Sequence, residues 1–344
     1  MPIDPIKLAR QLIDIPSPTD HERAVAEFLE PLLASIGFSV ERHYVTDHRF
    51  NLLARTATQP RVVLCTHLDT VPPFIASSED ATHLFGRGAC DTKGLMAAML
   101  RAAEQLLLGG VDAFGMLLVV GEETDSIGAK RANEHFGNLG SEYVVVGEPT
   151  ESRFVRASKG ALTVTVAFRG IAAHSAYPER GDSAIVKLAD AVKAISAHDW
   201  GEHPSLGRST ANVGVIRGGI KANIVPPAAE LEMIFRIVEE PELVLRKLEA
   251  LVAPLGGSVA SWYGNAPVPM AVPRGVESTV VAFNTDAPHL RKLGKPLLFG
   301  PGSILDAHTD RERIAKADLL DAVETYRGLV VDLIEGKVTE HEQA

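Results

Sequence analysis

The sequence predicts an α/β protein, in which a mostly parallel sheet covered by helices carries an inserted α+β domain. Over the first 150 residues, short apolar runs such as RVVLCTHLD at 61–69 alternate with helical patterns, which is typical of a parallel sheet with both faces covered. From about Leu162 apolar and polar residues alternate with a period of two, which is typical of antiparallel strands with one exposed face. The length of 344 residues fits about two domains.

The larger domain begins at the N-terminus. Helical spacing of apolar residues starts at once and is interrupted by PSPTD at 16–20. Further along, the sequence predicts four strands, at 51–55, 61–69, 115–123 and 141–150, and a helix at 94–110. We expect this first part of the larger domain to cover residues 1–161.

The inserted domain is expected at residues 162–266. Its predicted elements follow the order strand, helix, strand, strand, helix, strand, at 162–170, 182–198, 210–219, 229–238, 241–256 and 257–264. This order is the ferredoxin-like βαββαβ unit. The chain then returns to the larger domain over residues 267–344, where we predict a helix at 275–294, a strand at 295–303 and a helix at 315–335.

Composition excludes several classes of function. The net charge of −10 argues against nucleic acid and anionic membranes as partners, because both require clustered Lys and Arg. Two cysteines, Cys65 and Cys90, are too few for a disulfide framework, which favours a reducing cytoplasm. The N-terminus lacks the pattern of a signal peptide, and no run of about 18 apolar residues predicts a membrane span.

Polar residues cluster where the predicted parallel strands end. In such sheets ligands bind at the carboxyl ends of the strands. Three strands each end in acids or a histidine: His67 with Asp69, Glu122 with Glu123, and Glu148. Asp91, in the glycine-rich GRGACDTKG, and His308, in FGPGSILDAH, add one group each.

Imidazole and carboxylate together suit zinc or a similar divalent ion. There are more acids than one ion needs, and two ions about 3.5–4 Å apart that share a carboxylate would use them all. An H-x-D pair or an E-E pair alone more often lies in a solvent-exposed loop without a metal, and GRGACDTKG lacks the spacing of a phosphate-binding loop. Their common place at one predicted sheet edge favours the metal site.

Six segments, in order along nearly the whole chain, resemble the successive motifs of the M20 metallohydrolases. They are THLDTVPP, GRGACDTKG, GEETDSIGAK, VVGEPT, GIAAHSAYPERGDSAI and FGPGSILDAH. That family includes acetylornithine deacetylases, succinyl-diaminopimelate desuccinylases, aminoacylases and glutamate carboxypeptidases. The resemblance implies a catalytic domain interrupted by a lid, and two divalent metal ions per subunit, Zn²⁺ or Co²⁺.

The resemblance also implies a set of metal ligands. His67 and Glu148 would bind one ion, Glu123 and His308 would bind the other, and Asp91 would bridge both.

Three further groups would take part in catalysis. Asp69 would orient His67 from behind, and Glu122 would be the general base. His174 would reach from the lid into the active site of the other subunit, where it would stabilise the oxyanion. This role implies a homodimer built through the lids.

Substrate-binding residues are also implied by the family pattern. Asn223 matches a lid residue that contacts the substrate, while Lys159 and Arg236 match basic residues that bind its α-carboxylate. Gly302 and Ser303 would add backbone and hydroxyl contacts to the same carboxylate.

The expected activity is removal of an N-acyl group from an N-acyl-L-amino acid. An N-acetyl amino acid of the arginine pathway, N-acetylornithine or N-acetylcitrulline, is favoured. The alternatives are succinyl-diaminopimelate, amino-carrier-linked lysine, and a dipeptide or carboxypeptidase substrate. A non-catalytic dimeric binder of the same fold would be expected to have lost the base or the bridging acid, yet Glu122 and Asp91 are both present. A serine hydrolase would need a G-x-S-x-G elbow, which GPGSI does not supply.

Overall fold

The computed structural model describes residues 2–56 and 59–339, and the chain divides into two compact units. Unit 1 comprises Met1–Arg156, Pro269–Thr279 and Thr285–Ala344, and unit 2 comprises Ala157–Val268 and Val280–Asn284. Each unit has a hydrophobic core of its own. The limits predicted from the sequence, 161/162 and 266/267, lie a few residues from the crossings at 156/157 and 268/269.

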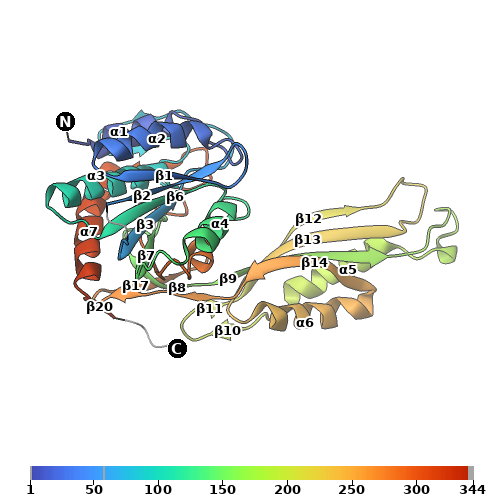
Figure 1. Cartoon of the computed structure of the whole chain (residues 1–344). Helices are drawn as coiled ribbons and strands as arrows, with labels where there is room; N and C mark the ends of the chain where they lie inside the picture. Colours follow the sequence, from blue (N-terminus) through green and yellow to red (C-terminus); the bar gives the residue numbers. More distant parts are fainter. Residues whose placement is uncertain (1, 57–58, 340–344) are drawn as a thin grey trace. The chain divides into compact units, whose positions relative to one another are not determined.

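Unit 1 is built on a mixed sheet whose centre is parallel (Figure 1). The strand order begins β1-β2-β6-β3-β7-β18. Strands β6, β3, β7 and β18 run parallel, and β1 and β2 are antiparallel to their neighbours. The bounds are β1 Ser39–Tyr44, β2 Phe50–Arg55, β3 Val62–His67, β6 Phe114–Val119, β7 Tyr143–Val146 and β18 Lys295–Leu298. The predicted fold class, a mostly parallel sheet with an inserted α+β domain, is confirmed.

Helices cover both faces of this sheet. α1 (Pro5–Ile13), α2 (Arg23–Ser35), α3 (Lys93–Leu108) and α7 (Lys316–Ile334) share one core with strand residues such as Leu64 and Met116. The alternate residues Val63 and Leu117 point to the other face and are equally buried. That face carries α4 (Ile127–Phe136), which contacts β2 and β6. Within the described ranges, no helix is both long and apolar enough to cross a membrane.

The helix predicted over 275–294 is wrong. The structure has strand β17 (Ser278–Val281) and the single 3₁₀ turn η3 (Ala287–His289) in this segment. The physical reason lies in the residue types. Thr279, Val280 and Val281 are β-branched and favour a strand, and Pro288 does not permit a helix to continue through it from the preceding residues.

Unit 2 has the predicted βαββαβ order. Its elements are β9 (Gly160–Arg169), α5 (Ala184–Ala197), β12 (Thr210–Gly218), β13 (Ala228–Ile237), α6 (Pro241–Val252) and β14 (Gly257–Asn265). The four strands form an antiparallel sheet in the order β12-β13-β9-β14. Residues of β9 and β13 alternate between buried and half-buried, because α5 and α6 pack on only one face of the sheet.

Short elements complete the chain. In unit 1 they include a three-stranded sheet of β4 (Ser78–Glu79), β5 (His83–Phe85) and β19 (Arg313–Ala315). The chain crosses between the units in β8 (Phe154–Ser158), β15 (Val268–Pro269) and β17. The remaining segments are η1 Pro178–Arg180, β10 Glu202–His203, β11 Gly207–Arg208, η2 Ala253–Leu255, β16 Val272–Pro273 and β20 Val338–Thr339.

Candidate metal centre

The carboxyl ends of the four parallel strands deliver most of the predicted ligands to one edge of the unit 1 sheet. His67 is the last residue of β3, Glu122 and Glu123 follow β6, and Glu148 follows β7. His308 lies in the loop after β18. Parallel strands end on the same side, so segments far apart in sequence meet here.

Asp91 comes from the glycine-rich turn before α3. This turn is tight: a Cβ on Gly94 would lie 2.0 Å from the carbonyl oxygen of Ala89. Only glycine fits that approach. The turn places Asp91 at the same sheet edge as His67.

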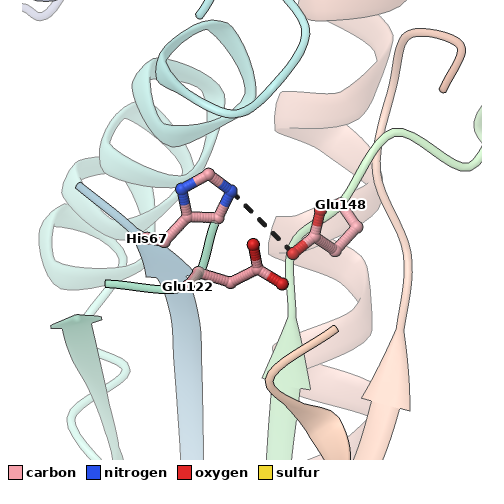
Figure 2. A group of neighbouring side chains, drawn as sticks. All are labelled: His67, Glu122 and Glu148. Atoms are coloured by element: carbon pink, nitrogen blue, oxygen red, sulfur yellow. Dashed lines mark ion pairs between the residues drawn. The ribbon is translucent and has the colours of Figure 1, made fainter. Parts of the chain in front are cut away.

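Two groups of side chains could each hold a divalent ion. The ligand atoms of His67, Glu122 and Glu148 lie within 4.8 Å of one another, as do those of His67, Asp91 and Glu123. Figure 2 shows the first group, with the His67 ring directed toward the Glu148 carboxylate and Glu122 beside it.

Asp91 lies between two histidines. Its Oδ1 is 3.1 Å from Nε2 of His67, and its Oδ2 is 3.2 Å from Nε2 of His308. His308 Nε2 is also 3.0 Å from Oε2 of Glu123. Each oxygen of Asp91 therefore faces a different histidine, which is the arrangement that a bridging carboxylate between two ions requires.

The donor set fits two divalent cations. Oε1 of Glu148 is buried and has no hydrogen-bond partner among the described residues; the nearest basic atom, His67 Nε2, is 4.0 Å away. Burial raises the pKa of Glu148 well above its usual range, and burial together with the charge of Glu148 does the same for Glu122. The carboxylates of Asp91 and Glu123 raise the pKa of His308 to about 10. Crowded buried acids need positive charge to stay ionised, and two divalent cations would supply it.

Asp69 contacts His67 mainly through its main-chain carbonyl and not through its carboxylate. The closer partner of His67 Nδ1 is the main-chain carbonyl of Asp69, at 2.9 Å, whereas the carboxylate Oδ1 is 3.6 Å away. The Asp69 carboxylate accepts the main-chain N–H groups of Glu122 and Glu123 at 3.1 and 3.2 Å, and the hydroxyl of Thr19 at 2.8 Å. Asp69 thus fixes both the histidine and the turn that carries the two glutamates.

Sequence reasoning missed two buried acids near this edge. Asp286 has an Oδ1 without a hydrogen-bond partner in the described part of the chain, and burial raises its pKa to about 7. It lies in the segment that was predicted as a helix, and no pattern singled it out. Glu312 is also buried. No side-chain pattern singles it out in the sequence either.

Gly302 and Ser303 lie in unit 1, in the loop between β18 and His308. Gly302 has a φ of +85°, and a Cβ there would lie 2.7 Å from Cβ of Cys90. The hydroxyl of Ser303 donates to Oε1 of Glu151 at 3.0 Å. Both residues line a cavity of about 330 Å³, together with His83, Glu151, Ser152, Asp306, Arg313, Ile314, Ala315 and Asp318. The predicted metal ligands are not among these lining residues.

Four predicted site residues, Lys159, His174, Asn223 and Arg236, lie in unit 2, at two ends of its sheet. Arg236 pairs in register with Ala161, two residues after Lys159, so these two bases lie near the start of β9. His174 forms a bridge with Ile224, and the Ser175 N–H donates to the carbonyl of Asn223. His174 and Asn223 therefore lie together, beyond the far end of β9.

The lengths of the strands keep these two pairs apart. β9 has ten residues, and a strand rises about 3.3 Å per residue, so roughly 30 Å separates its ends. One copy of unit 2 cannot bring all four side chains to one small substrate.

Comparisons with known proteins agree with this architecture. A family profile described as a peptidase dimerisation domain matches residues 156–258. A probable carboxypeptidase of Aspergillus flavus is 35% identical over an aligned region of 369 residues. The alignment covers 93% of this chain and 88% of the fungal protein. A peptidase M20 domain-containing protein of Schizosaccharomyces pombe is 34% identical over 338 residues, covering 95% of this chain and 84% of that protein. The solved structure of a dinuclear metal-binding peptidase of the M20 family from Bacillus subtilis matches with a TM-score of 0.71 at 14% identity, covering 96% of this chain and 98% of that one.

A mostly parallel sheet with a histidine- and carboxylate-rich edge and an inserted dimerisation domain defines a metal-binding hydrolase of amide or peptide bonds. The chain belongs to the M20 peptidase family, so the resemblance identified from its motifs is confirmed.

Proposed function

We propose that this protein is a two-metal hydrolase that cleaves the amide bond preceding a carboxy-terminal amino acid with a free α-carboxylate. The observation that carries the proposal is the placement of Asp91, whose two oxygens face His67 and His308 at 3.1 and 3.2 Å. A carboxylate whose two oxygens each face a different predicted ligand is placed to bridge two ions, as a dinuclear site requires.

His67 and Glu148 would hold one ion, Glu123 and His308 the other, and Asp91 both. When bound, two Zn²⁺ or Co²⁺ ions supply Lewis acidity, which polarises a carbonyl group and lowers the pKa of water. Asp69 keeps His67 in the tautomer that leaves Nε2 free for metal, because Nδ1–H donates to the Asp69 carbonyl.

Glu122 would be the general base. Its carboxylate lies beside His67 and Glu148, and its main-chain N–H donates to the Asp69 carboxylate, which holds the turn in place. It would accept a proton from the attacking water and deliver it to the leaving amine. Burial and the nearby acids raise its pKa, so the positive charge of bound ions is what would allow it to start as a carboxylate.

His174 would stabilise the oxyanion in the active site of the partner subunit. Its Nδ1 accepts the N–H of Ala176 at 3.1 Å, so a neutral ring carries its proton on Nε2, which is a donor. The imidazole is exposed. The separation of His174 from Arg236 along β9 supports the use of two copies of the lid at each site.

A homodimer through unit 2 would supply that second copy. The family profile over residues 156–258 describes a dimerisation domain. β12 lies at the edge of the sheet, and on the helix-covered side it is bordered by α5, which it contacts. Ile185, Val186 and Ile216 are exposed there. An apolar patch at a strand edge fits a second copy of the same surface.

Substrate recognition would depend on the terminal carboxylate. Lys159 and Arg236 are both partly buried cations whose pKa values burial lowers, and a guanidinium pairs well with a carboxylate. Asn223 would contact the substrate from the partner's lid. Gly302 and Ser303 would add contacts, although the Ser303 hydroxyl must leave Glu151 to do so.

Two kinds of acyl group on the substrate are consistent with this proposal. The motifs favour an acetyl group, as in N-acetylornithine or N-acetylcitrulline, whereas the name of the Aspergillus flavus relative favours a peptidyl group. Both substrates share the bond and the carboxylate, so they differ only in what lies on the acyl side. The two buried free cysteines suit a reducing compartment such as the cytoplasm.

A substrate panel tests the proposal. Chelator-treated protein reloaded with Zn²⁺ or Co²⁺ would be assayed on N-acetylornithine, N-acetylcitrulline, N-succinyl-diaminopimelate, a free dipeptide and an N-blocked dipeptide. We expect hydrolysis of at least one, and loss of that activity when its carboxylate is amidated. Equal cleavage of the amidated substrate would refute recognition through the carboxylate. Two bound ions with no hydrolysis of any substrate would favour the binding-protein alternative.

A further inference from the structure

Glu312 lies at the junction of two loops that carry predicted metal ligands. It is buried, and it follows His308 by four residues. Its Oε1 accepts three main-chain N–H groups of the other loop, from Gly88 at 2.9 Å and from Cys90 and Asp91 at 3.2 Å each. Convergent N–H groups of this kind form a nest for an anion, and here the anion is a side chain of the same protein.

Arg87 neutralises the other oxygen of this carboxylate. Its Nη1 is 2.5 Å from Oε2 of Glu312, and both side chains are buried. The same guanidinium donates to the carbonyls of Pro73 and Thr309 at 3.3 Å. Arg87 therefore ties the loop after His67 and the loop of His308 to the turn that contains Asp91.

These contacts join the two segments that carry Asp91 and His308. Asp91 and His308 lie 217 positions apart in the chain, yet Oδ2 and Nε2 are 3.2 Å apart. His308 is half exposed and has a φ of +62°, so packing alone does not hold its side chain. Glu312 joins the loop of His308 to the turn of Asp91, since its carboxylate accepts the Asp91 N–H and its main-chain carbonyl accepts the Gly86 N–H.

We propose that Glu312, with Arg87, is a positioning residue that sets the separation of Asp91 from His308 and so the affinity of the ion bound by Glu123 and His308. The inference rests on the proposed two-metal function. Loss of the Glu312 carboxylate frees the nest, and the Asp91 turn and the His308 loop then move independently. Substitution of a residue that holds a metal ligand in place typically lowers metal affinity by about 10- to 100-fold.

Binding of Co²⁺ alone tests this role, because it requires no substrate. Metal-free full-length protein would be titrated with Co²⁺, with visible absorption reporting ligand geometry and calorimetry resolving the two sites. The variants are Glu312→Asp, which keeps the charge but shortens the reach, and Arg87→Gln/Glu312→Gln, which leaves no unpaired buried charge. The control is Glu324→Gln, which removes the acid of an exposed Arg–Glu pair on α7.

We expect one Co²⁺ site to weaken at least about tenfold in both variants, with an altered absorption band, and the other site to weaken less. The control should bind as the wild type does. Affinities within twofold of wild type in a folded variant would overturn the inference, as would failure of both variants to fold, because Glu312 would then serve fold stability. Wild-type protein that binds fewer than two ions would refute the proposed function itself, whatever the variants do.

Discussion

The carboxylate of Asp69 accepts a hydrogen bond from the main-chain N–H of Glu122 at 3.1 Å. A side chain that was expected only to orient a histidine also holds the proposed base in place. The neighbouring N–H of Glu123 donates to the second oxygen of the same carboxylate. One buried acid therefore couples the end of β3 to the turn after β6.

Replacing Asp69 with Asn should lower both stability and turnover. The amide offers one acceptor and one donor, so one of the two part-buried N–H groups loses its partner, which costs about 1 kcal/mol or more. The free energy of unfolding in urea and kcat on the best substrate would measure this. Thr19→Val is the control, because it removes only the hydroxyl donor to Asp69. A kcat within twofold of wild type in Asp69→Asn would show that the turn holds its position without the carboxylate.

Substitutions of Glu122 and Glu123 should reduce activity for different reasons. Glu123→Gln should weaken one metal site, and excess Zn²⁺ or Co²⁺ should restore part of its activity. Glu122→Gln should keep both ions yet lose about 10²–10⁴-fold in kcat, since the base acts in the transition state. Metal analysis beside steady-state kinetics would separate the two effects. Loss of metal from Glu122→Gln would instead make Glu122 a ligand of the group that it forms with His67 and Glu148.

Mixing two inactive variants should restore activity. If His174 serves the partner's site, a dimer of one Glu122→Gln chain and one His174→Ala chain contains one complete site. Random exchange of subunits would then recover about a quarter of wild-type activity, because half of the dimers are mixed and each has one intact site of two. Activity before and after exchange would be compared. No recovery, with mixed dimers shown by mass spectrometry, would mean that His174 acts within its own subunit or not at all.

The half-buried His289 should make stability depend on pH. Burial, followed by the charge of Lys130, lowers its pKa to about 4 in the folded protein, against about 6.5 in an unfolded chain. Above pH 6.5 the residue is neutral in both states and has no effect. Between about pH 6.5 and 4 only the unfolded chain takes up the proton, so the free energy of unfolding falls as the pH falls.

The expected loss for His289 is on the order of 1–2 kcal/mol at pH 5 relative to pH 7, once partial exposure to solvent is considered. Urea unfolding of metal-free wild type and His289→Gln at the two pH values would measure the difference. His48→Gln, at an exposed position, is the matched control. An identical change with pH in wild type and His289→Gln would contradict the assignment.

Sequence patterns predicted the parts of this protein that depend on periodicity. Apolar runs marked the parallel strands, and acids directly after them marked the edge at which His67 and Glu148 meet. The contacts of Glu312 were not accessible in this way, because they depend on the main-chain conformation of residues 86–91 and not on any side-chain pattern. Asp286 is not predictable for a different reason: the pattern at 275–294 predicts a helix, and a residue within that helix does not follow the end of a parallel strand.

The proposed metal ligands are synthesised in two stages. His67, Asp91, Glu123 and Glu148 all precede residue 150, whereas His308 follows about 160 residues later. At 5–20 residues per second, roughly ten to thirty seconds separate the two events during synthesis. Throughout that interval a nascent chain lacks one of the two histidines proposed as ligands. With this ligand set, the ion proposed for Glu123 and His308 can acquire all of its protein ligands only after residue 308 has been synthesised.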